Sequence, residues 1–293
     1  MTLKCVSPPS VGSLSHYEHP SYYDKCYAGR VQDVAFYRSV ARSAGSVLEH
    51  GCGNGRIALP IARDGIPIVG LDLSAAMLDS FRKRLGRETD EVRNRVSVFR
   101  GDMRTKRFRQ RFDLIICAFN TFLHLYDRND VERYLALVRR HLAHGGVFAF
   151  DTSLPVPEEL ARDPKRPFVV PRLKHPDSGL VVRYAEYFDY DPLTQVLRVT
   201  MRFDPSGGVS AGWTVLLEHR QYYPQEIEAL LHYNGFVLES MYPNLGDGTG
   251  APVDSIGWLA RCAKDRSGRV ASRGTISAPC VGDSSIASAV GLG

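Results

Sequence analysis

The chain has 293 residues, of which 44% are hydrophobic and 24% are charged, and its formal net charge is +5. These values exclude a disordered or collagen-like protein, and the charge is lower than a dedicated nucleic-acid binder carries. No apolar run approaches the roughly 18 residues of a membrane span, the first residues lack a secretory apolar segment, and the six cysteines form no CxxC pair. We therefore expect a cytoplasmic protein with reduced thiols, no metal site and no membrane contact.

Residues 1–45 are predicted to form an N-terminal lid segment. Residues 1–20 are rich in Ser and Pro and are expected to be loose. Residues 21–45 combine a helical spacing of apolar side chains with a dense run of tyrosines. This spacing predicts helix after a loose start.

Residues 46–153 alternate short apolar runs with amphipathic stretches. Strands are predicted over 46–50, 67–71, 96–99, 112–119 and 147–150, and helices over 54–63, 75–85 and 131–142. Strands that alternate with helices predict a parallel sheet built of right-handed crossover units.

The pattern changes after residue 153. Runs over 180–190, 193–203 and 213–223 are strand-like, and the second alternates apolar with polar side chains, which predicts an antiparallel sheet with one wet face. We expect residues 154–223 to form a cap over the substrate. Residues 224–263 then supply a helix over 225–234 and closing strands over 236–242 and 255–261, and residues 264–293 form a disordered tail.

The strongest local signal is the segment EHGCGNG at residues 49–55, where a strand turns into a helix. Glycines allow a ligand to approach the backbone, and the helix N-terminus offers unpaired N–H groups. The third glycine of a nicotinamide-binding fingerprint would fall at position 56, which is Arg56. The pattern therefore favours a nucleotide-like ligand over a dehydrogenase cofactor, with a glycine-rich turn that binds nothing as the alternative.

Two acidic residues follow neighbouring predicted strands. Asp72 ends the second strand, where a carboxylate can accept both hydroxyls of a ribose, although Asp72 or Ser74 would equally suit a helix N-cap. Asp102 and Met103 follow the third strand, where they suit an adenine amino group and ring face. The alternative for Asp102 is a simple Asp-containing turn.

The motifs VLEHGCGNGRIALPIA, VGLDLSAAML, RGDMR, FDLIICAFNTFLHL and HLAHGGVFAFD together resemble the class I S-adenosylmethionine-dependent methyltransferases over residues 45–153. The flanking segments YYDKCYAGR and HRQYYPQEIEALLHYNGFVLES are similar to bacterial small-molecule members, including amino-sugar N-methyltransferases. The resemblance implies an α/β fold with a Rossmann-like, doubly wound, mostly parallel seven-stranded sheet and an antiparallel β cap insertion. It also implies S-adenosylmethionine as cofactor, S-adenosylhomocysteine as product and no metal.

The resemblance assigns roles by position. It implies that the methionine and ribose lie along the glycine loop, the ribose hydroxyls on the acid of the second strand, and the adenine beside the acid of the third. Two lid residues would close over the cofactor, with Arg56 as an alternative partner for its carboxylate. The cofactor-binding residues implied in this way are Tyr23, Arg30, Glu49, Gly51, Gly53, Asp72, Leu73, Asp102, Met103 and Asn120, the last near the transferring methyl group. His50 stands where the family often has a small or apolar residue, and we interpret it as a satisfied, partly buried histidine.

The segment after the fourth strand supplies the candidate catalytic residues. An amine must be neutral to attack the methyl group, so we predict His124 as the base, with Tyr126 orienting the acceptor. Local packing is the alternative for both. In the cap, Arg220 and Tyr222 are the predicted substrate-binding residues, and the mixture of aromatic and acidic groups suits an amine.

We therefore predict in-line transfer of a methyl group to a small-molecule acceptor, with an amine nitrogen favoured over a hydroxyl. An O-methyltransferase and a non-catalytic protein that binds a partner through this fold stay as alternatives. Residues 82–111 hold twelve basic and four acidic side chains, which a solvated surface explains as well as a nucleic-acid contact does. Residues 120–123 read NTFL, not the NPPY type that acts on base amino groups, so we expect no nucleic-acid partner. The oligomeric state is left open, with a homodimer as one option.

Overall fold

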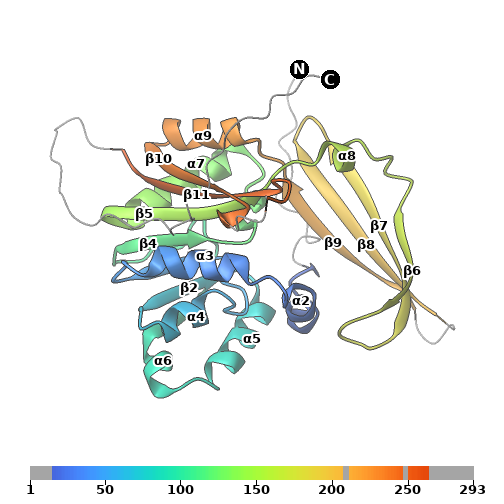
Figure 1. Ribbon diagram of the computed structural model, residues 1–293, viewed down its shortest axis with the longest axis horizontal. Helices are drawn as coiled ribbons and strands as arrows, with labels where there is room; N and C mark the ends of the chain where they lie inside the picture. The colour runs from blue at the N-terminus through green and yellow to red at the C-terminus, as the bar shows by residue number, and fades with distance from the viewer. Residues whose placement is uncertain (1–14, 207–210, 247–249, 264–293) are drawn as a thin grey trace.

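The structure is a computed structural model that describes residues 15–206, 211–246 and 250–263. It contains a seven-stranded sheet of order β10-β11-β5-β4-β1-β2-β3 and a four-stranded sheet of order β6-β7-β8-β9, which lie on either side of helix α2 (Figure 1). The predicted fold class is confirmed. The expected disordered tail, 264–293, and the first residues of the expected lid lie outside the described residues.

The bounds of the elements follow in chain order. The strands are β1 (Val47–His50), β2 (Ile68–Asp72), β3 (Val96–Arg100), β4 (Phe112–Cys117), β5 (Leu142–Ser153), β6 (Phe168–Lys174), β7 (Val181–Asp191), β8 (Val196–Pro205), β9 (Trp213–Arg220), β10 (Phe236–Pro243) and β11 (Ser255–Cys262). The helices are α2 (Pro20–Tyr27), α3 (Gln32–Ala41), α4 (Ala58–Arg63), α5 (Ala75–Leu85), α6 (Asp90–Arg95), α7 (Arg128–His141), α8 (Pro157–Leu160) and α9 (Pro224–Tyr233), with 3-10 turns η1 (Thr121–His124) and η2 (Asn244–Gly246).

The strand order of the large sheet indicates where a ligand would bind. Strands β1 to β5 run parallel, whereas β11 pairs antiparallel with β5 and β10 antiparallel with β11. The chain moves outward from β1 through β2 to β3, and then resumes at β4 on the other side of β1. In open α/β sheets, ligands bind outside the carboxyl ends of the strands at such a switch point.

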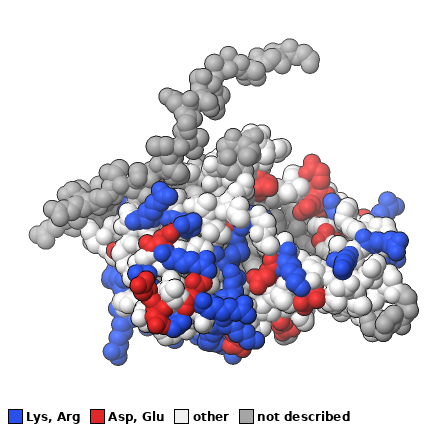
Figure 2. Space-filling view, turned by 60° about the horizontal axis from the view of Figure 1, so that its bottom comes forward, with Lys and Arg blue, Asp and Glu red and all other residues white. Residues whose placement is uncertain are grey.

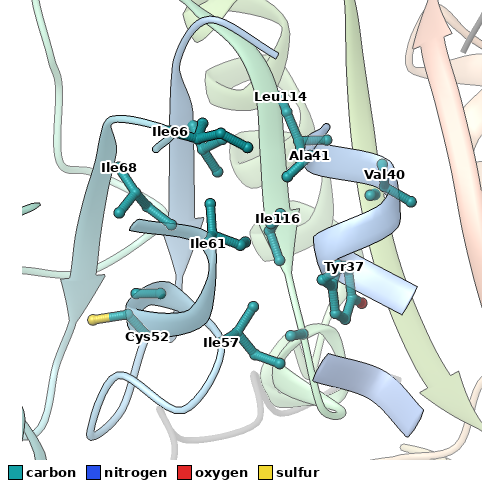
Figure 3. Packing of buried hydrophobic residues seen from close by; sticks show 14 of the residues in the cluster. Tyr37, Val40, Ala41, Cys52, Ile57, Ile61, Ile66, Ile68, Leu114 and Ile116 are labelled. Atoms are coloured by element: carbon teal, nitrogen blue, oxygen red, sulfur yellow. The ribbon is translucent and has the colours of Figure 1, made fainter. Parts of the chain in front are cut away.

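Both faces of the large sheet are covered by helices, and its central strands β1, β4 and β5 are mostly buried on both sides. Helices α4, α5 and α6 lie on one side, and α7 and α9 on the other (Figure 1). On the first side, Tyr37 and Val40 of α3 and Ile61 of α4 pack against Leu114 and Ile116 of β4 (Figure 3). This packing holds the strands, and therefore their carboxyl ends, in fixed positions.

Two predicted elements are shorter than expected because of backbone conformation. The helix predicted over 54–63 begins at Ala58, since Gly53 and Gly55 have φ angles of 52° and 81°. The strand predicted over 112–119 ends at Cys117, since Phe119 and Asn120 also have positive φ. Both departures lie at the carboxyl edge of the sheet.

The small sheet packs against the N-terminal segment. The predicted alternation of β8 is confirmed, because Leu197, Met201 and Phe203 are buried. The Tyr22 ring of α2 lies edge-on to Phe203 and stacks on His175, with centroids 5.8 and 5.0 Å apart. Strand β6 and helices α6 and α8 were not predicted. Among the described residues, no helix has both the length and the apolar character that a membrane crossing requires.

His50, the last residue of β1, is buried between the large sheet and helix α7. It is completely buried, and its Nδ1 is 3.1 Å from the hydroxyl of Tyr134 on α7, while Nε2 has no hydrogen-bond partner among the described residues. Burial lowers the pKa of His50 to about 3. The interpretation as a histidine with only a structural role therefore fits the geometry, but one ring nitrogen is left unsatisfied.

This burial makes stability depend on pH. The unfolded chain protonates His50 near its ordinary pKa of 6.5, whereas the folded chain does not until about pH 3. Stability is therefore complete above pH 6.5 and falls as the pH is lowered. Between pH 6.5 and 4.5 in urea unfolding, we expect the free energy of unfolding of His50→Gln, which cannot titrate, to fall by about 2 kcal/mol less than that of the parent. Equal losses in both chains would contradict this role.

Candidate functional site

A cavity of about 200 Å³ opens at the carboxyl ends of β1 to β4, at the switch point of the sheet. It brings together ten of the predicted site residues: Tyr23, Glu49, Gly51, Gly53, Asp72, Leu73, Asp102, Met103, His124 and Tyr126. It also includes residues that the sequence did not single out, among them Tyr17, Asn54, Ser74, Met77, Arg104, Phe119 and Thr121. The predicted residues Arg30, Asn120, Arg220 and Tyr222 do not line it.

The glycine loop and Asp72 form one hydrogen-bonded unit. Asp72 Oδ2 accepts the N–H of Gly53 at 2.7 Å, and Oδ1 accepts the N–H of Ser74 at 2.8 Å. Burial raises the pKa of Asp72, and these N–H groups oppose the rise. Gly51 has φ 68°, and a Cβ there would lie 2.5 Å from the side chain of Thr121. The backbone of the loop can therefore face the cavity only with glycine at this position.

Glu49 offers an unused acceptor at the end of β1. Its side chain is 2% exposed, and its Oε2 has no hydrogen-bond partner among the described residues. Burial raises the pKa of Glu49 well above its usual range, and the Arg56 guanidinium opposes that rise. Buried polar atoms are nearly always satisfied. This orphaned oxygen therefore fits a bound ligand that brings a hydrogen-bond donor.

Arg56 and Arg30 hold the ring of Phe119. Arg56 forms a two-point ion pair with the buried carboxylate of Asp33, at 2.7 and 2.5 Å, and lies 5.1 Å from the centroid of the Phe119 ring. The guanidinium of Arg30 lies 4.7 Å from the same centroid. Arg30, predicted to close over the cofactor, lies in this structure against Phe119 of the cavity wall.

Asp102 lies at the end of β3 and is paired. Its carboxylate accepts hydrogen bonds from the guanidinium of Arg104, the closest at 2.6 Å, and Arg104 also bonds Asp130 of α7 at 2.5 Å. Burial alone would raise the pKa of Asp102, but the bonds from Arg104 outweigh it and lower the pKa. Asp102 is therefore ionised and held toward the cavity beside Met103.

A chain of hydrogen bonds determines which ring nitrogen of His124 carries the proton. The Tyr126 hydroxyl donates to the carbonyl of Glu218 in β9 at 3.1 Å, so its oxygen accepts from His124 Nδ1 at 3.2 Å. A neutral imidazole carries one proton, so Nε2 accepts from the hydroxyl of Tyr17, 2.8 Å away. Burial raises the pKa of Tyr17 and lowers that of His124 to about 4, which keeps both groups neutral. The His219 ring of the small sheet lies 4.9 Å from that of His124.

Arg220 and Tyr222, the predicted substrate-binding residues, make structural contacts away from the lining of the cavity. Tyr222 is 1% exposed, packs on Phe122, and donates its hydroxyl to the carbonyl of Leu125. Arg220 forms an ion pair with Glu226 at 2.6 Å and lies over the Tyr222 ring at 4.2 Å. Both residues fasten the end of β9 to the core.

Asn120 also has a structural contact where the sequence predicted a ligand. Its Oδ1 accepts the N–H of Ser153 at 2.6 Å, and the residue has φ 62°. The neighbouring N–H of Phe119 donates to Asp151 of β5 at 2.6 Å. The turn after β4 is therefore tied to the end of β5, and Phe119 and Thr121 line the cavity on either side of Asn120.

Fold and cavity together define a Rossmann-like protein with a nucleotide-type ligand site at its switch point. Residues 47–146 match a family model described as a methyltransferase domain. A dTDP-3-amino-3,4,6-trideoxy-alpha-D-glucopyranose N,N-dimethyltransferase of Streptomyces venezuelae is 30% identical over 138 residues, which are 44% of this chain and 55% of that protein. This chain thus spans about half the length of the curated relative that it matches.

Solved structures extend the likeness beyond the matched domain. The CcbJ methyltransferase of Streptomyces caelestis has a TM-score of 0.67 at 22% identity, over 83% of this chain and 98% of that one. The amino pentose methyltransferase CalS10 of Micromonospora echinaspora, solved with S-adenosylmethionine bound, has a TM-score of 0.60 at 21% identity, over 81% and 95%. The predicted resemblance to class I S-adenosylmethionine-dependent methyltransferases is confirmed: residues 47–146 match a methyltransferase domain, and the fold is that of these structures.

Proposed function

We propose that the protein transfers a methyl group from S-adenosylmethionine to an amine nitrogen of a small molecule. The observation that carries the proposal is the set of three carboxylates, Glu49, Asp72 and Asp102, at the ends of three adjacent strands along one cavity wall. Glu49 would accept the ammonium of the methionine part, Asp72 the ribose hydroxyls and Asp102 the adenine amino group. The orphaned oxygen of Glu49 supports this fit, because a cationic ligand group would satisfy it.

The chain itself has to position and deprotonate the acceptor. The bound cofactor supplies an already activated methyl group, so alignment and the exclusion of water account for most of the catalysis, worth about 7–11 kcal/mol. An amine binds as an ammonium at neutral pH and must lose a proton before it attacks. Tyr17 and His124 form the path that takes up this proton, since Nε2 of His124 carries no proton and accepts from the Tyr17 hydroxyl. An ammonium proton passes to the Tyr17 oxygen as the phenol proton moves to Nε2.

The choice of an amine over a hydroxyl follows from the strength of this base. Burial lowers the pKa of His124 to about 4 and leaves the imidazole a neutral, weak base, which suits an ammonium better than an alcohol because an ammonium loses its proton far more readily. Two of the proteins named above, the Streptomyces venezuelae N,N-dimethyltransferase and the amino pentose methyltransferase CalS10, carry names that point to amino sugars, which supports an amino sugar as the acceptor class. An O-methyltransferase is the second candidate, which the assay below separates from the first.

A nucleic-acid acceptor is not part of the proposal. On the face shown in Figure 2, Lys and Arg stand beside Asp and Glu in many places. Within the basic segment 82–111, Arg82 pairs with Asp79 and Arg93 with Asp90, which is the behaviour of a solvated surface.

The test is a methyl-transfer assay with one amine and its matched alcohol. We expect the parent chain to methylate dTDP-3-amino-3,4,6-trideoxy-α-D-glucopyranose at the nitrogen, seen by mass spectrometry, and to leave the 3-hydroxy counterpart unchanged. Activity should persist in EDTA, because the proposal includes no metal. Transfer to the alcohol would favour the second candidate. Binding of S-adenosylhomocysteine without transfer to either compound would support a non-catalytic protein.

A further inference from the structure

The turn after β4 adopts a backbone conformation that its residues do not favour. Phe119 and Asn120 are consecutive, neither is glycine, and their φ angles are 52° and 62°. The left-handed region costs an L residue about 1–2 kcal/mol. Strain of this kind persists only where the surrounding structure enforces it, and it is concentrated at functional sites.

Asp151 at the end of β5 enforces this turn. Its side chain is 3% exposed, and its Oδ1 accepts both the N–H of Phe119 at 2.6 Å and the hydroxyl of Tyr37 at 2.5 Å. The N–H of Ser153 meets Oδ1 of Asn120 at 2.6 Å. None of the ion pairs between described residues includes Asp151. A buried carboxylate without a cation is a poor source of stability, so stability alone does not explain it.

The turn sets the wall of the cavity that faces the glycine loop. Phe119 and Thr121 line the cavity, and Thr121 packs against Gly51, where even a methyl group would not fit. His124 ends the 3-10 turn that begins at Thr121. A change at Asn120 would therefore shift an aromatic ring, a hydroxyl and the imidazole together, relative to the carboxylates that hold the cofactor.

We propose that Asp151 is a positioning residue for methyl transfer, which fixes the strained Phe119–Asn120 turn and thereby aligns the acceptor side of the cavity with the cofactor side. This role rests on the proposed function. Asp151 touches neither the cavity nor His124, so its effect on the rate is indirect. Tyr37 of α3 supports it from the core.

The test compares Asp151→Ala with two matched variants. The N–H of Phe119 and the hydroxyl of Tyr37 both donate to Oδ1, so Asp151→Asn keeps an acceptor for these two donors while it removes the charge and replaces Oδ2 by an NH2 group. Thr152 is the next residue of the strand and is as deeply buried, at 1% exposed. Thr152→Val removes the hydrogen bond that its hydroxyl accepts from the Trp258 indole at 3.0 Å. Adjacent strand residues point to opposite faces, so Thr152 does not face the turn.

We expect Asp151→Ala to lower kcat for the dTDP-amino sugar about 100-fold, the effect of a displacement of about 1 Å in a reacting group. The Kd for S-adenosylhomocysteine should stay within about threefold of the parent, since all three cavity carboxylates are untouched. Asp151→Asn should recover most of kcat, and Thr152→Val should melt at a lower temperature with unchanged kcat. Rates are normalised to the calorimetric binding stoichiometry, which corrects for unfolded protein.

Several outcomes would overturn this role. They are a parent-like kcat in Asp151→Ala, an equal loss in Asp151→Asn, an equal loss in Thr152→Val, or a parallel loss of cofactor affinity. If Asp151→Ala does not fold, Tyr37→Phe carries the test, since it keeps the ring in the core; we expect about fivefold lower kcat, and a parent-like value would end the proposal. A parent chain that methylates nothing overturns the proposed function first, and this role with it.

Discussion

Replacement of Asp72 by alanine is expected to weaken the binding of S-adenosylhomocysteine at least tenfold, or about 1.4 kcal/mol. Two effects act in the same direction. The ligand loses a charged acceptor, and the N–H groups of Gly53 and Ser74 lose the carboxylate that holds them at 2.7 and 2.8 Å. Hydrogen bonds to charged groups are worth about 1.5–3 kcal/mol each, so a loss of 100-fold is within range. Isothermal titration calorimetry measures the change directly.

The matched control for this variant is Asp79→Ala. Asp79 lies on α5, its side chain is 65% exposed, and its partner is Arg82 on the same helix at 2.9 Å. It removes the same charge from the same region without touching the cavity, so binding should match the parent. If Asp72→Ala binds as tightly as Asp79→Ala does, the cavity at the switch point is not the cofactor site.

Replacement of His124 by glutamine is expected to lower kcat by about 10²–10⁴-fold, the usual contribution of a general base. The Kd for S-adenosylhomocysteine should be unchanged, because the three carboxylates that would hold the cofactor stay in place. His232→Gln is the control, since His232 is exposed on α9. A variant of His124 that keeps the parent kcat would show that the amine loses its proton to solvent.

The pH profile of kcat provides a second readout for His124. Burial lowers its pKa to about 4, so the neutral, proton-accepting form persists well below pH 6.5. With a saturating concentration of the amino sugar, kcat should change less than about twofold between pH 7.5 and 5.5. A histidine of ordinary pKa would be about 90% protonated at pH 5.5 and would lower kcat about tenfold. A tenfold fall over this range would therefore contradict the burial of the base.

The cofactor side of the cavity could be predicted because it follows from local sequence. A carboxylate at the carboxyl end of a parallel strand must lie at the ligand edge of the sheet. The positions of the strands were therefore sufficient to place Glu49, Asp72 and Asp102 at that edge. Strand and helix positions in turn followed from the period of the apolar residues. The sequence also predicted that His124 and Tyr126 lie at this edge, since they follow β4.

The acceptor side could not be predicted in the same way. Tyr17 meets His124 across more than one hundred residues of chain, and it lies in a segment whose composition indicated a loose start. Tyr222 follows a strand whose alternation ends at Arg220, so no periodicity showed that it turns into the core. The turn at Phe119 escaped prediction for another reason: two non-glycine residues in the left-handed region contradict local preference, and the contact that explains them comes from Asp151 on the neighbouring strand β5.

The insertion of the small sheet has a consequence for the order in which the chain can fold. Ser153 at the end of β5 pairs with Ser255 at the start of β11, about one hundred residues later, and all of the small sheet lies between them. Its own pairings are local, since β7, β8 and β9 are consecutive neighbours. On a ribosome, these hairpins can form while the edge of β5 is still open. Nascent chains that stop before residue 255 should therefore remain protease-sensitive in β5, and protection should appear only once β11 has left the exit tunnel.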